Sequence, residues 1–458
     1  MLTRLNFVRR LLFSMDGELG RGAFLIVALP VWLSQHLFAA ICIQLSSASI
    51  LRDTNEQVLF AVNPLRALFP LKDQIVVTVG IVSMVLVAWS LTALSFRRAR
   101  SAGFSPGLGV VMMVPFAQPL ALLMFATAPL KSSITVVEEE PFPNESNMRA
   151  AVLGAAIGML VCVAAVVFST LVFHSYGYGV FLATPCVVGI VAGYIATPKR
   201  SEDDGYPGRV AVSALVLGGC MIFGVAAEGL ICLLMAAPLA IPVCLVGAAI
   251  GYQAAKFQRR RTTLSAVAVL PLLIMLEAAF PTDATFVSVR SVEIAAQPDA
   301  VWRSITHMGE IHTPPAAPFG WGLAYPIAGE INGEGVGAVR KGVFSTGVAY
   351  ERVTVWDPGH ELTFNVLSDP PALRELSPYD NVSAPHLAGY FTTAYAKFTL
   401  EPLPGGRTRL SLETQHTLRL EPAVYWTPLA RLAIEENKRR VLQHFAEQAE
   451  AMGGVLPP

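Results

Sequence analysis

Four polar side chains in the last third of the chain could carry chemistry: Arg340, Glu351, Thr414 and His416. In the stretch 407–420, Thr414 and His416 alternate in phase with leucines, whereas charged residues occupy the other phase. Glu351 likewise falls in phase with neighbouring valines. Because successive side chains of a strand point to opposite faces, we expect these three residues to point inward. The pattern leaves the face of Arg340 open.

Two kinds of role fit such buried polar groups. An unpaired buried carboxyl group has a raised pKa and could act as an acid or a base. Alternatively, Glu351 and His416 bond each other or the backbone inside a filled core.

The inward phase as a whole predicts an apolar pocket with a few polar groups, as is typical of small-molecule sites. The predicted lining consists of Arg340, Glu351, Val353, Val355, Phe364, Phe398, Leu412, Thr414 and His416. Two long connections, 312–330 and 368–390, have lengths often found in lids over a site. At the pocket rim we expect Trp321, Tyr379, Asp380, His386 and Tyr390, although Trp321 could equally pin its loop to the sheet.

A change of period near residue 283 predicts the elements that position these residues. The run 286–296 alternates at period two, as a half-buried strand does, and a helix is expected to begin at Pro298. Turn sequences at 357–359 and 404–406 are typical of antiparallel hairpins. The other expected strands are 336–345, 347–356, 361–367, 391–401 and 407–420.

A long helix is expected over 428–452, with Thr427 as its cap and Pro428 in its first turn. Its apolar stripe has three- and four-residue spacing. The stripe consists of Ile434, Lys438, Val441, Phe445 and Ala449.

Several classes of site are not expected. The histidines after residue 283 lack HxxxH or HxH spacing and no cysteine accompanies them, so we expect no metal site. No nucleophile elbow, phosphate loop or dinucleotide fingerprint is present, so no cofactor is expected. All six cysteines fall in apolar segments before residue 250 and are interpreted as small buried side chains. No basic, aromatic surface indicates nucleic acid.

The first 280 residues are expected to lie in a membrane. The chain of 458 residues is 14% charged, whereas soluble proteins carry about 25%. Its mean hydropathy is +0.54, and the first apolar run begins too late for a cleaved signal peptide. Candidate spanning segments, each near the required length of about 20 residues, are 23–46, 74–96, 107–129, 150–173, 177–197, 209–227, 230–253 and 263–280.

Charge placement predicts the orientation, because Lys and Arg near helix ends favour the cytoplasm. The strongest clusters are Arg4/Arg9/Arg10, Arg97/Arg98/Arg100 and Lys256/Arg259/Arg260/Arg261. Five candidates separate the last two clusters, so one must fail to cross if both are cytoplasmic. The weakest is 107–129, which two prolines split into a bent or re-entrant hairpin; the region 209–253 is the other suspect. The chain after residue 282 is then extracytoplasmic, whereas eight crossings would make it cytoplasmic.

Glu228 is the acidic residue within the apolar stretch 209–253. A carboxylate in lipid is a functional candidate by default. The interpretation we favour is a hairpin turn at the membrane interface, followed by Gly229.

The C-terminal portion, about 285–450, resembles the START-like superfamily, also called SRPBCC, with its polyketide cyclase/dehydrase and lipid-transport families. The resemblance rests on "VEIAAQPDAVWRSITHMGEI", "YERVTVWDPGHELTFNV" and "GGRTRLSLETQHTLRLEPAVYW" with "VLQHFAEQAE", in that order. It implies an α+β helix-grip fold, in which a curved antiparallel sheet wraps on a long C-terminal helix. It also implies an internal pocket for a hydrophobic ligand, but it fixes no activity.

The first 130 residues are similar to the bacterial DUF805 membrane family. The matching residues are Gly20-Arg21 before the first helix and Arg97-Arg98 through Gly103 before the third segment. Ser101 stands where that family usually has an acidic residue. The resemblance implies membrane architecture and no particular function.

The expected organisation is a DUF805-like membrane region (1–130), further transmembrane helices (131–282) and a START-like ligand-binding unit (283–458). We expect a multi-pass protein of a bacterial-type inner membrane that binds, senses or transfers a lipid or other hydrophobic small molecule. The alternatives are a cyclase- or hydrolase-type enzyme using Glu351 and His416, and a docking module without a ligand. The short tether after the last helix would keep the pocket at the bilayer.

Overall fold

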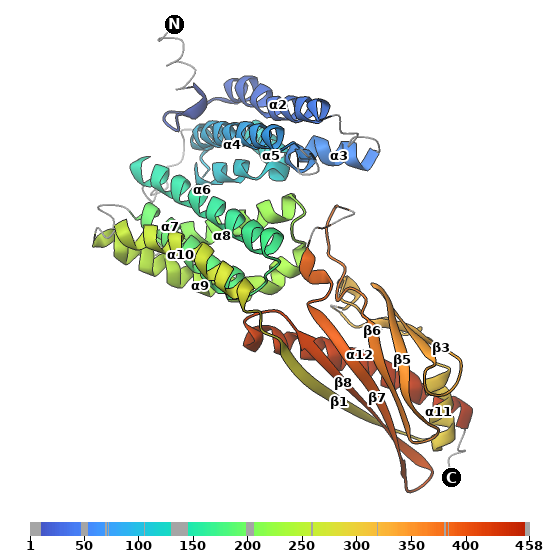
Figure 1. The fold of residues 1–458 in the computed structure, drawn as a ribbon. Helices are drawn as coiled ribbons and strands as arrows, with labels where there is room; N and C mark the ends of the chain where they lie inside the picture. Colours follow the sequence, from blue (N-terminus) through green and yellow to red (C-terminus); the bar gives the residue numbers. More distant parts are fainter. Residues whose placement is uncertain are drawn as a thin grey trace.

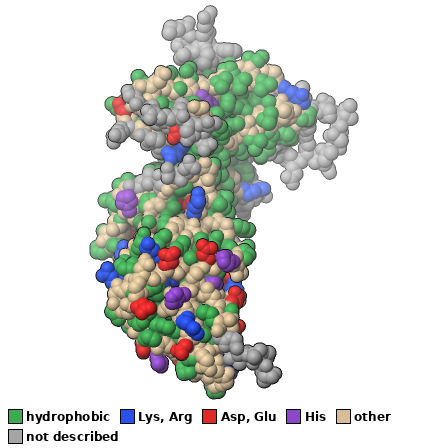
Figure 2. All heavy atoms as spheres, turned by 90° about the vertical axis from the view of Figure 1, so that its right-hand side faces the viewer, with side chains coloured by type: hydrophobic (Ala, Val, Ile, Leu, Met, Phe, Trp, Pro, Cys, Tyr) green, Lys and Arg blue, Asp and Glu red, His purple; other side chains and the backbone are tan. Residues whose placement is uncertain are grey.

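The structure, a computed structural model, describes residues 11–46, 54–68, 71, 73–104, 106–129, 145–197, 206–257, 260–317, 319–379, 382 and 384–453. It consists of a stack of apolar helices, here called the helical region (11–279), and an antiparallel sheet with a long helix, here called the sheet unit (284–453). Figure 1 shows the sheet unit at one end of the stack. Figure 2 shows hydrophobic side chains over the helical region and most charged side chains on the sheet unit.

Among the described residues, six helical segments are long and apolar enough to cross a membrane. They are α2 (Arg21–Leu45), α4 (Gln74–Ala102), α6 (Glu145–Val167), η5 with α7 (Gly179–Ala183 and Thr184–Ala196), α8 (Tyr206–Gly224) and α9 (Leu230–Lys256). A shorter apolar helix, α10 (Arg260–Ala279), precedes the sheet unit. Short elements connect them: α3 (Thr54–Val62), η1 (Pro64–Leu68) and η4 (Phe168–Val172).

The segment after α4 is bent, as the sequence predicts. It comprises η2 (Pro106–Met113), η3 (Pro115–Ala117) and α5 (Gln118–Thr127), and its two halves meet at 116°. The fully buried Arg98 near the end of α4 donates hydrogen bonds to the carbonyl oxygens of Phe125 (2.9 Å) and Ala128. The segment therefore starts and finishes at the same end of α4, as a hairpin does.

Two of the three arginines that support the DUF805 resemblance, Arg21 and Arg98, meet at this hairpin. Arg21 donates a hydrogen bond of 2.7 Å to the carbonyl oxygen of Ala128, which Arg98 also binds. Cations suit the carbonyl oxygens at a helix C-terminus. These arginines thus hold the end of α5 in place.

The sheet unit contains eight antiparallel strands in the order β1-β8-β7-β6-β5-β4-β3-β2. They are β1 (Ala284–Ile294), β2 (Gly309–Glu310), β3 (Pro326–Asn332), β4 (Val339–Phe344), β5 (Gly347–Asp357), β6 (Glu361–Ser368), β7 (Phe391–Leu403) and β8 (Arg407–Leu418). Helix α11 (Pro298–Thr306) follows β1, α12 (Ala423–Gly453) ends the chain, and η6 (Phe319–Trp321) and η7 (Pro385–Leu387) lie in loops. This is the element order of the predicted helix-grip fold.

A hydrophobic core joins the sheet to both helices at the end far from the helical region. Phe445 on α12 is fully buried and packs edge-on against Phe398 of β7, with ring centroids 5.6 Å apart. Val301 and Ile305 on α11 complete this core. Burying one such side chain contributes about 1.5–3 kcal/mol, so the packing fixes α12 against the sheet.

Two parts of the sheet unit differ from the sequence prediction. Strand β3 begins within the segment 312–330, which was expected to be an irregular loop, and extends beyond it. Helix α12 begins at Ala423, so Thr427 is not its cap and Pro428 lies inside it. The backbone carbonyl of Pro422 accepts the first helical hydrogen bonds instead, from the N–H groups of Tyr425 and Trp426.

Candidate functional site

A cavity of about 850 Å³ lies between the sheet, α12 and the first turns of α9. Ligand pockets usually measure about 300–1,000 Å³, so this one can hold a small organic molecule or a lipid chain. Its wall is mainly apolar, with a few polar side chains. The sheet unit is therefore hollow at the end nearest the helical region and solid at the other.

Most of the predicted lining residues lie in this wall. They are Arg340, Glu351, Phe364, Phe398, Leu412, Thr414 and His416. Thr414 and His416 are buried, in phase with the leucines of β8. Strict alternation along β8 explains why the sequence was informative here.

Two predicted lining residues, Val353 and Val355, are not in the wall. Val353 is 1% exposed and belongs to the packed core. Val355 is 37% exposed because a β-bulge interrupts the alternation of β5: Val353 pairs with Phe364 but Val355 pairs with Thr363. An extra residue in one strand moves the following side chains to the other face, so the inward orientation expected for Val355 is wrong.

Arg340 and Glu351 face each other across β4 and β5 and form a buried ion pair. The Arg340 guanidinium also lies over the ring of Phe364, 4.5 Å from its centroid. Burial raises the pKa of Glu351, and the positive charge of Arg340 opposes that rise. Glu351 is thus bound to Arg340 rather than to His416, and it is not the unpaired carboxyl group that an acid–base mechanism needs.

His416 is held as a neutral ring in the cavity wall. Its Nε2 lies 2.6 Å from the hydroxyl of Thr414 and its Nδ1 lies 3.2 Å from the hydroxyl of Thr393. Burial, aided by the charge of Lys438, lowers its pKa to about 3. Both nitrogens are occupied, so His416 is a polar patch in an apolar wall and not a free base.

Lys438 on α12 is a cavity residue that the sequence analysis placed only in an apolar stripe. Its Nζ donates hydrogen bonds to the backbone oxygen (2.5 Å) and the hydroxyl (2.8 Å) of Ser288. The side chain is 3% exposed, and burial lowers the pKa of the amine to about 8. The sequence signal for this residue was a lysine on the apolar stripe of a helix, because lysine side chains are almost never fully buried unless they are paired.

The cavity has an apolar mouth. Four lining residues are well exposed: Trp321 at 64%, Leu376 at 47%, Leu432 at 68% and Leu234 of α9 at 63%. Exposed apolar side chains grouped in this way mark contact surfaces or ligand entrances.

The residues predicted for the rim do not all lie at the cavity, and Asp380 lies outside the described residues. Trp321 and Tyr390 line the cavity, and the Tyr390 hydroxyl donates a hydrogen bond to the backbone oxygen of His174 in the helical region. Tyr379 does not line it and is buried against the helical region instead, where its hydroxyl meets Gly224. The loop 368–390 therefore serves as a docking surface as well as part of the wall.

Helix α9 contributes directly to the cavity wall through Ile231, Leu234 and Met235. The backbone oxygen of Met235 accepts a hydrogen bond of 2.5 Å from the hydroxyl of Tyr425 on α12. Sequence patterns could not reveal this wall, because its two sides are about two hundred residues apart in the chain.

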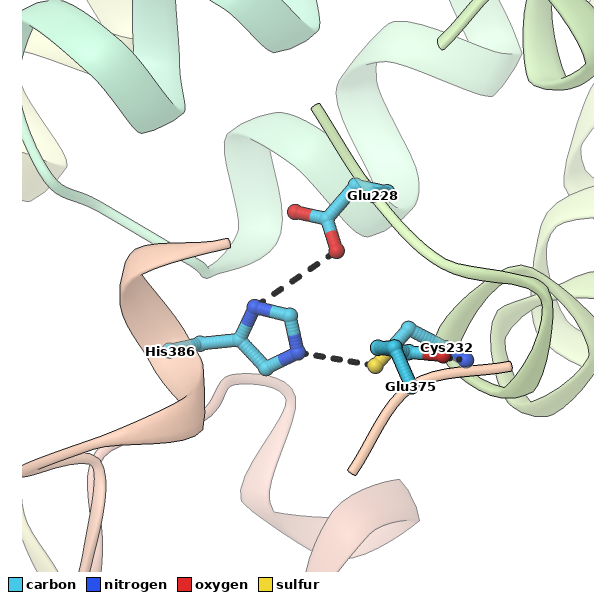
Figure 3. A group of neighbouring side chains, drawn as sticks. All are labelled: Glu228, Cys232, Glu375 and His386. Carbon is cyan, nitrogen blue, oxygen red and sulfur yellow. Dashed lines mark hydrogen bonds and ion pairs between the residues drawn. The ribbon is translucent and has the colours of Figure 1, made fainter. Parts of the chain in front are cut away.

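A polar cluster, Glu228, Cys232, Glu375 and His386, lies beside the cavity where the sheet unit meets α9 (Figure 3). His386 also lines the cavity; its Nε2 lies 2.8 Å from the sulfur of Cys232 and its Nδ1 lies 3.6 Å from Glu228. Burial raises the pKa of Glu228, in the turn after α8, to about 8 and lowers that of His386 to about 4. Glu228 occupies the turn that the sequence predicted.

Glu375 caps the start of α9. Its carboxylate accepts hydrogen bonds from the backbone N–H groups of Ile231 (3.0 Å) and Cys232 (3.2 Å). An added Cβ at Gly229 would lie 2.2 Å from a carboxylate oxygen of Glu375. Glycine is therefore required for this approach, and the contact ties the sheet unit to the helix.

No protein-family model matches the chain, and no curated protein matches its sequence. Among solved structures it is similar to the ZhuI aromatase/cyclase of Streptomyces sp. R1128, with 17% identity over 36% of this chain and 94% of that chain (TM-score 0.26). A truncated norcoclaurine synthase from Thalictrum flavum matches with 14% identity over 39% and 98% (TM-score 0.23). A Chromobacterium violaceum protein matches with 16% identity over 36% and 96% (TM-score 0.23). The DUF805 resemblance stays a prediction.

Proposed function

We propose that this protein is embedded in a membrane and uses the sheet unit to bind a lipid or another hydrophobic molecule taken from the bilayer. The observation that carries the proposal is the composition of the cavity wall, one side of which is an apolar helix, α9, long enough to span a membrane. A cavity built partly from such a helix lies at the membrane surface.

The exposed rim supports entry of the ligand from that surface. Leu234 on α9 and Leu376 from the sheet unit are both exposed and both line the cavity. An acyl chain leaving the bilayer beside α9 could pass between them without exposure to water, which removes most of the hydrophobic cost of extraction.

The arrangement of the helices supports one orientation of the sheet unit relative to the membrane. With the hairpin 106–127 re-entrant, the six long apolar helices alone would give an even number of crossings. We propose that the shorter apolar helix α10 also crosses, which makes seven. Arg97, Arg98 and Arg100 lie at the end of α4, beside the start of the chain, where Arg97 binds the backbone oxygen of Leu11 and Arg100 that of Met15. Since arginines favour the cytoplasm, we propose that the sheet unit is extracytoplasmic and that residues 1–282 anchor it.

The experiment is purification of the full chain in mild detergent, followed by extraction and mass spectrometry of bound lipids. A matched pair of variants tests whether the cavity holds them. Ala349, 2% exposed, lines the cavity, whereas its neighbour Val348 is 36% exposed and lies on the other face of β5. Ala349→Trp should fill the cavity and remove the bound lipid, whereas Val348→Trp should retain it.

Equal lipid in both variants would show that the molecules come from the annular surface of the helices, and the proposal would fail. A wild-type chain that carries no hydrophobic molecule and takes up none from vesicles would also contradict it.

A further inference from the structure

Two chain segments far apart in sequence bring four metal-ligand types together. Glu228 and Cys232 come from the turn before α9 and its first turn, and Glu375 and His386 come from the loop between β6 and β7. One ligand atom of each residue lies within 4.8 Å of those of the other three. We propose that this cluster binds a divalent metal ion of the zinc type and thereby fastens the sheet unit to the membrane helix.

The donor types select the metal. A thiol, an imidazole and two carboxylates are all groups that bind Zn²⁺, which takes four ligands in a tetrahedron in structural sites. Hard cations such as Ca²⁺ and Mg²⁺ prefer oxygen ligands alone. The mixed set therefore favours a borderline metal over a hard one.

Unpartnered atoms point into the cluster. The Oε2 atom of Glu228 and the Nδ1 atom of His386 have no hydrogen-bond partner, and their side chains are only 7% and 9% exposed. The two atoms are 3.6 Å apart, which is too long for a hydrogen bond. Two ligands bound to one Zn²⁺ at bond lengths of about 2.0–2.2 Å lie about 3.5 Å apart. Figure 3 shows the His386 ring between Glu228 and Cys232, so binding of Cys232 to an ion at Nδ1 requires its sulfur to move from the Nε2 side of the ring.

A bound cation would offset the cost of ionising the carboxyl groups of the cluster. Within the described part of the chain, no lysine or arginine forms an ion pair with Glu228 or Glu375, and His386 is the charge partner recorded for Glu228. Buried carboxylates are costly unless they are paired or bind a metal. A divalent ion would neutralise both.

Neighbouring groups already orient the ligands. The hydroxyl of Tyr176 donates a hydrogen bond of 2.6 Å to Oε1 of Glu228, which leaves Oε2 for an ion. The ring of Tyr176 lies 4.5 Å from that of His386. The backbone N–H groups at the start of α9 hold Glu375. Hydrogen bonds of this kind to ligands are a regular feature of metal sites.

The test uses the full chain in detergent, with Zn²⁺ and Co²⁺ as probes. After dialysis against metal-free buffer, elemental analysis should find a single zinc per chain. Replacement by Co²⁺ should give visible absorption of a tetrahedral site together with a sulfur-to-cobalt charge-transfer band. Cys232→Ser should abolish that band.

Variants and controls separate the site from general effects. Glu228→Gln keeps the size of the side chain, and His386→Asn removes the imidazole; both should lose the zinc. Tyr176→Phe should weaken Zn²⁺ binding about 10- to 100-fold, the usual effect of losing a group that orients a ligand. Cys220→Ser on α8 and His360→Asn on an exposed turn should retain it.

A wild-type chain that binds neither ion, or a Co²⁺ charge-transfer band that survives in Cys232→Ser, would overturn the proposal. Size-exclusion profiles show whether a variant is folded. If Cys232→Ser is not folded, the zinc content of Glu228→Gln tests the proposal instead. The readout is metal content and not lipid content. Failure here therefore leaves the proposed ligand-binding function standing, and the reverse also holds.

Discussion

The hydroxyl group of Tyr379 donates a hydrogen bond of 2.6 Å to the backbone oxygen of Gly224, the last residue of α8. Asn63 completes the contact, since its amide donates to the Tyr379 hydroxyl at 2.9 Å. Tyr379 belongs to the sheet unit and the other two residues to the helical region. The sheet unit is thus docked on the helices by buried hydrogen bonds in addition to its covalent tether.

Tyr379→Phe should loosen this docking. The variant loses one hydroxyl, whereas Asn63 and Gly224 stay bonded to each other, so the loss should be about 1 kcal/mol. Faster hydrogen exchange of the loop 368–390, measured by mass spectrometry on the full chain, would report it. Tyr395→Phe is the matched control, because that hydroxyl binds Glu413 on the sheet, away from the helices. Equal exchange in both variants would contradict the docking role.

His416 should make the sheet unit sensitive to acid. Its pKa is about 3 in the folded chain and about 6.5 in an unfolded one. Between these values the unfolded state binds a proton that the folded state does not, so stability is complete above pH 6.5 and falls as the pH drops towards 3. At pH 5 the loss attributable to His416 is about 2 kcal/mol.

Thermal unfolding of the full chain at pH 7 and pH 5 measures this loss. His416→Gln retains an amide for Thr414 and Thr393 but does not titrate, so the difference between the two pH values should shrink. An unchanged difference would mean that other groups cause the acid sensitivity.

Strand periodicity predicted the fold of the sheet unit well where the strands are regular. In β8, Leu412, Thr414 and His416 follow strict alternation, and the structure has them on the inner face. In β5 the same rule fails at Val355, because a bulge between Val353 and Val355 depends on pairing with β6 and leaves no mark in a single strand. Local sequence fixes a period, and tertiary pairing decides where the period is interrupted.

Contacts between the two regions were beyond sequence reasoning. Cys232 and His386 are adjacent in space but 154 residues apart in the chain. Neither shows a ligand spacing within its own segment, so the sequence indicated no metal site. Tyr379 was expected at a pocket rim because its loop is long, but it is docked on α8 instead. A long loop indicates a role without indicating the surface that it meets.

Lys438 should favour ligands with an acidic group. Two of its three N–H groups bind Ser288, and one remains for a ligand in the cavity. The amine, with a pKa of about 8, is charged at pH 7 and neutral at pH 9. Binding of a fluorescent fatty acid should therefore weaken over this range, by about tenfold for the loss of one charged hydrogen bond.

The Lys438→Met variant should bind the fatty acid weakly, and its affinity for the fatty acid should be nearly independent of pH. Lys397→Met removes an outer lysine of β7 that is paired with Glu361, and it should behave as the wild type. A fatty acid that binds Lys438→Met as tightly as the wild type at pH 7 would exclude a headgroup contact with this amine.

The sheet unit should face away from the cytoplasm, opposite to the start of the chain. Glu401 near the end of β7 and Glu18 before α2 are both exposed, and α2 and β7 lie at opposite ends of the structure (Figure 1). In intact spheroplasts, a membrane-impermeant maleimide should label Glu401→Cys, and it should label Glu18→Cys only after permeabilisation. The wild-type chain provides the background from its own cysteines. Labelling of both variants on the same side would require an even number of crossings, with either the hairpin 106–127 spanning the membrane or α10 not spanning it, and the proposed orientation would fail.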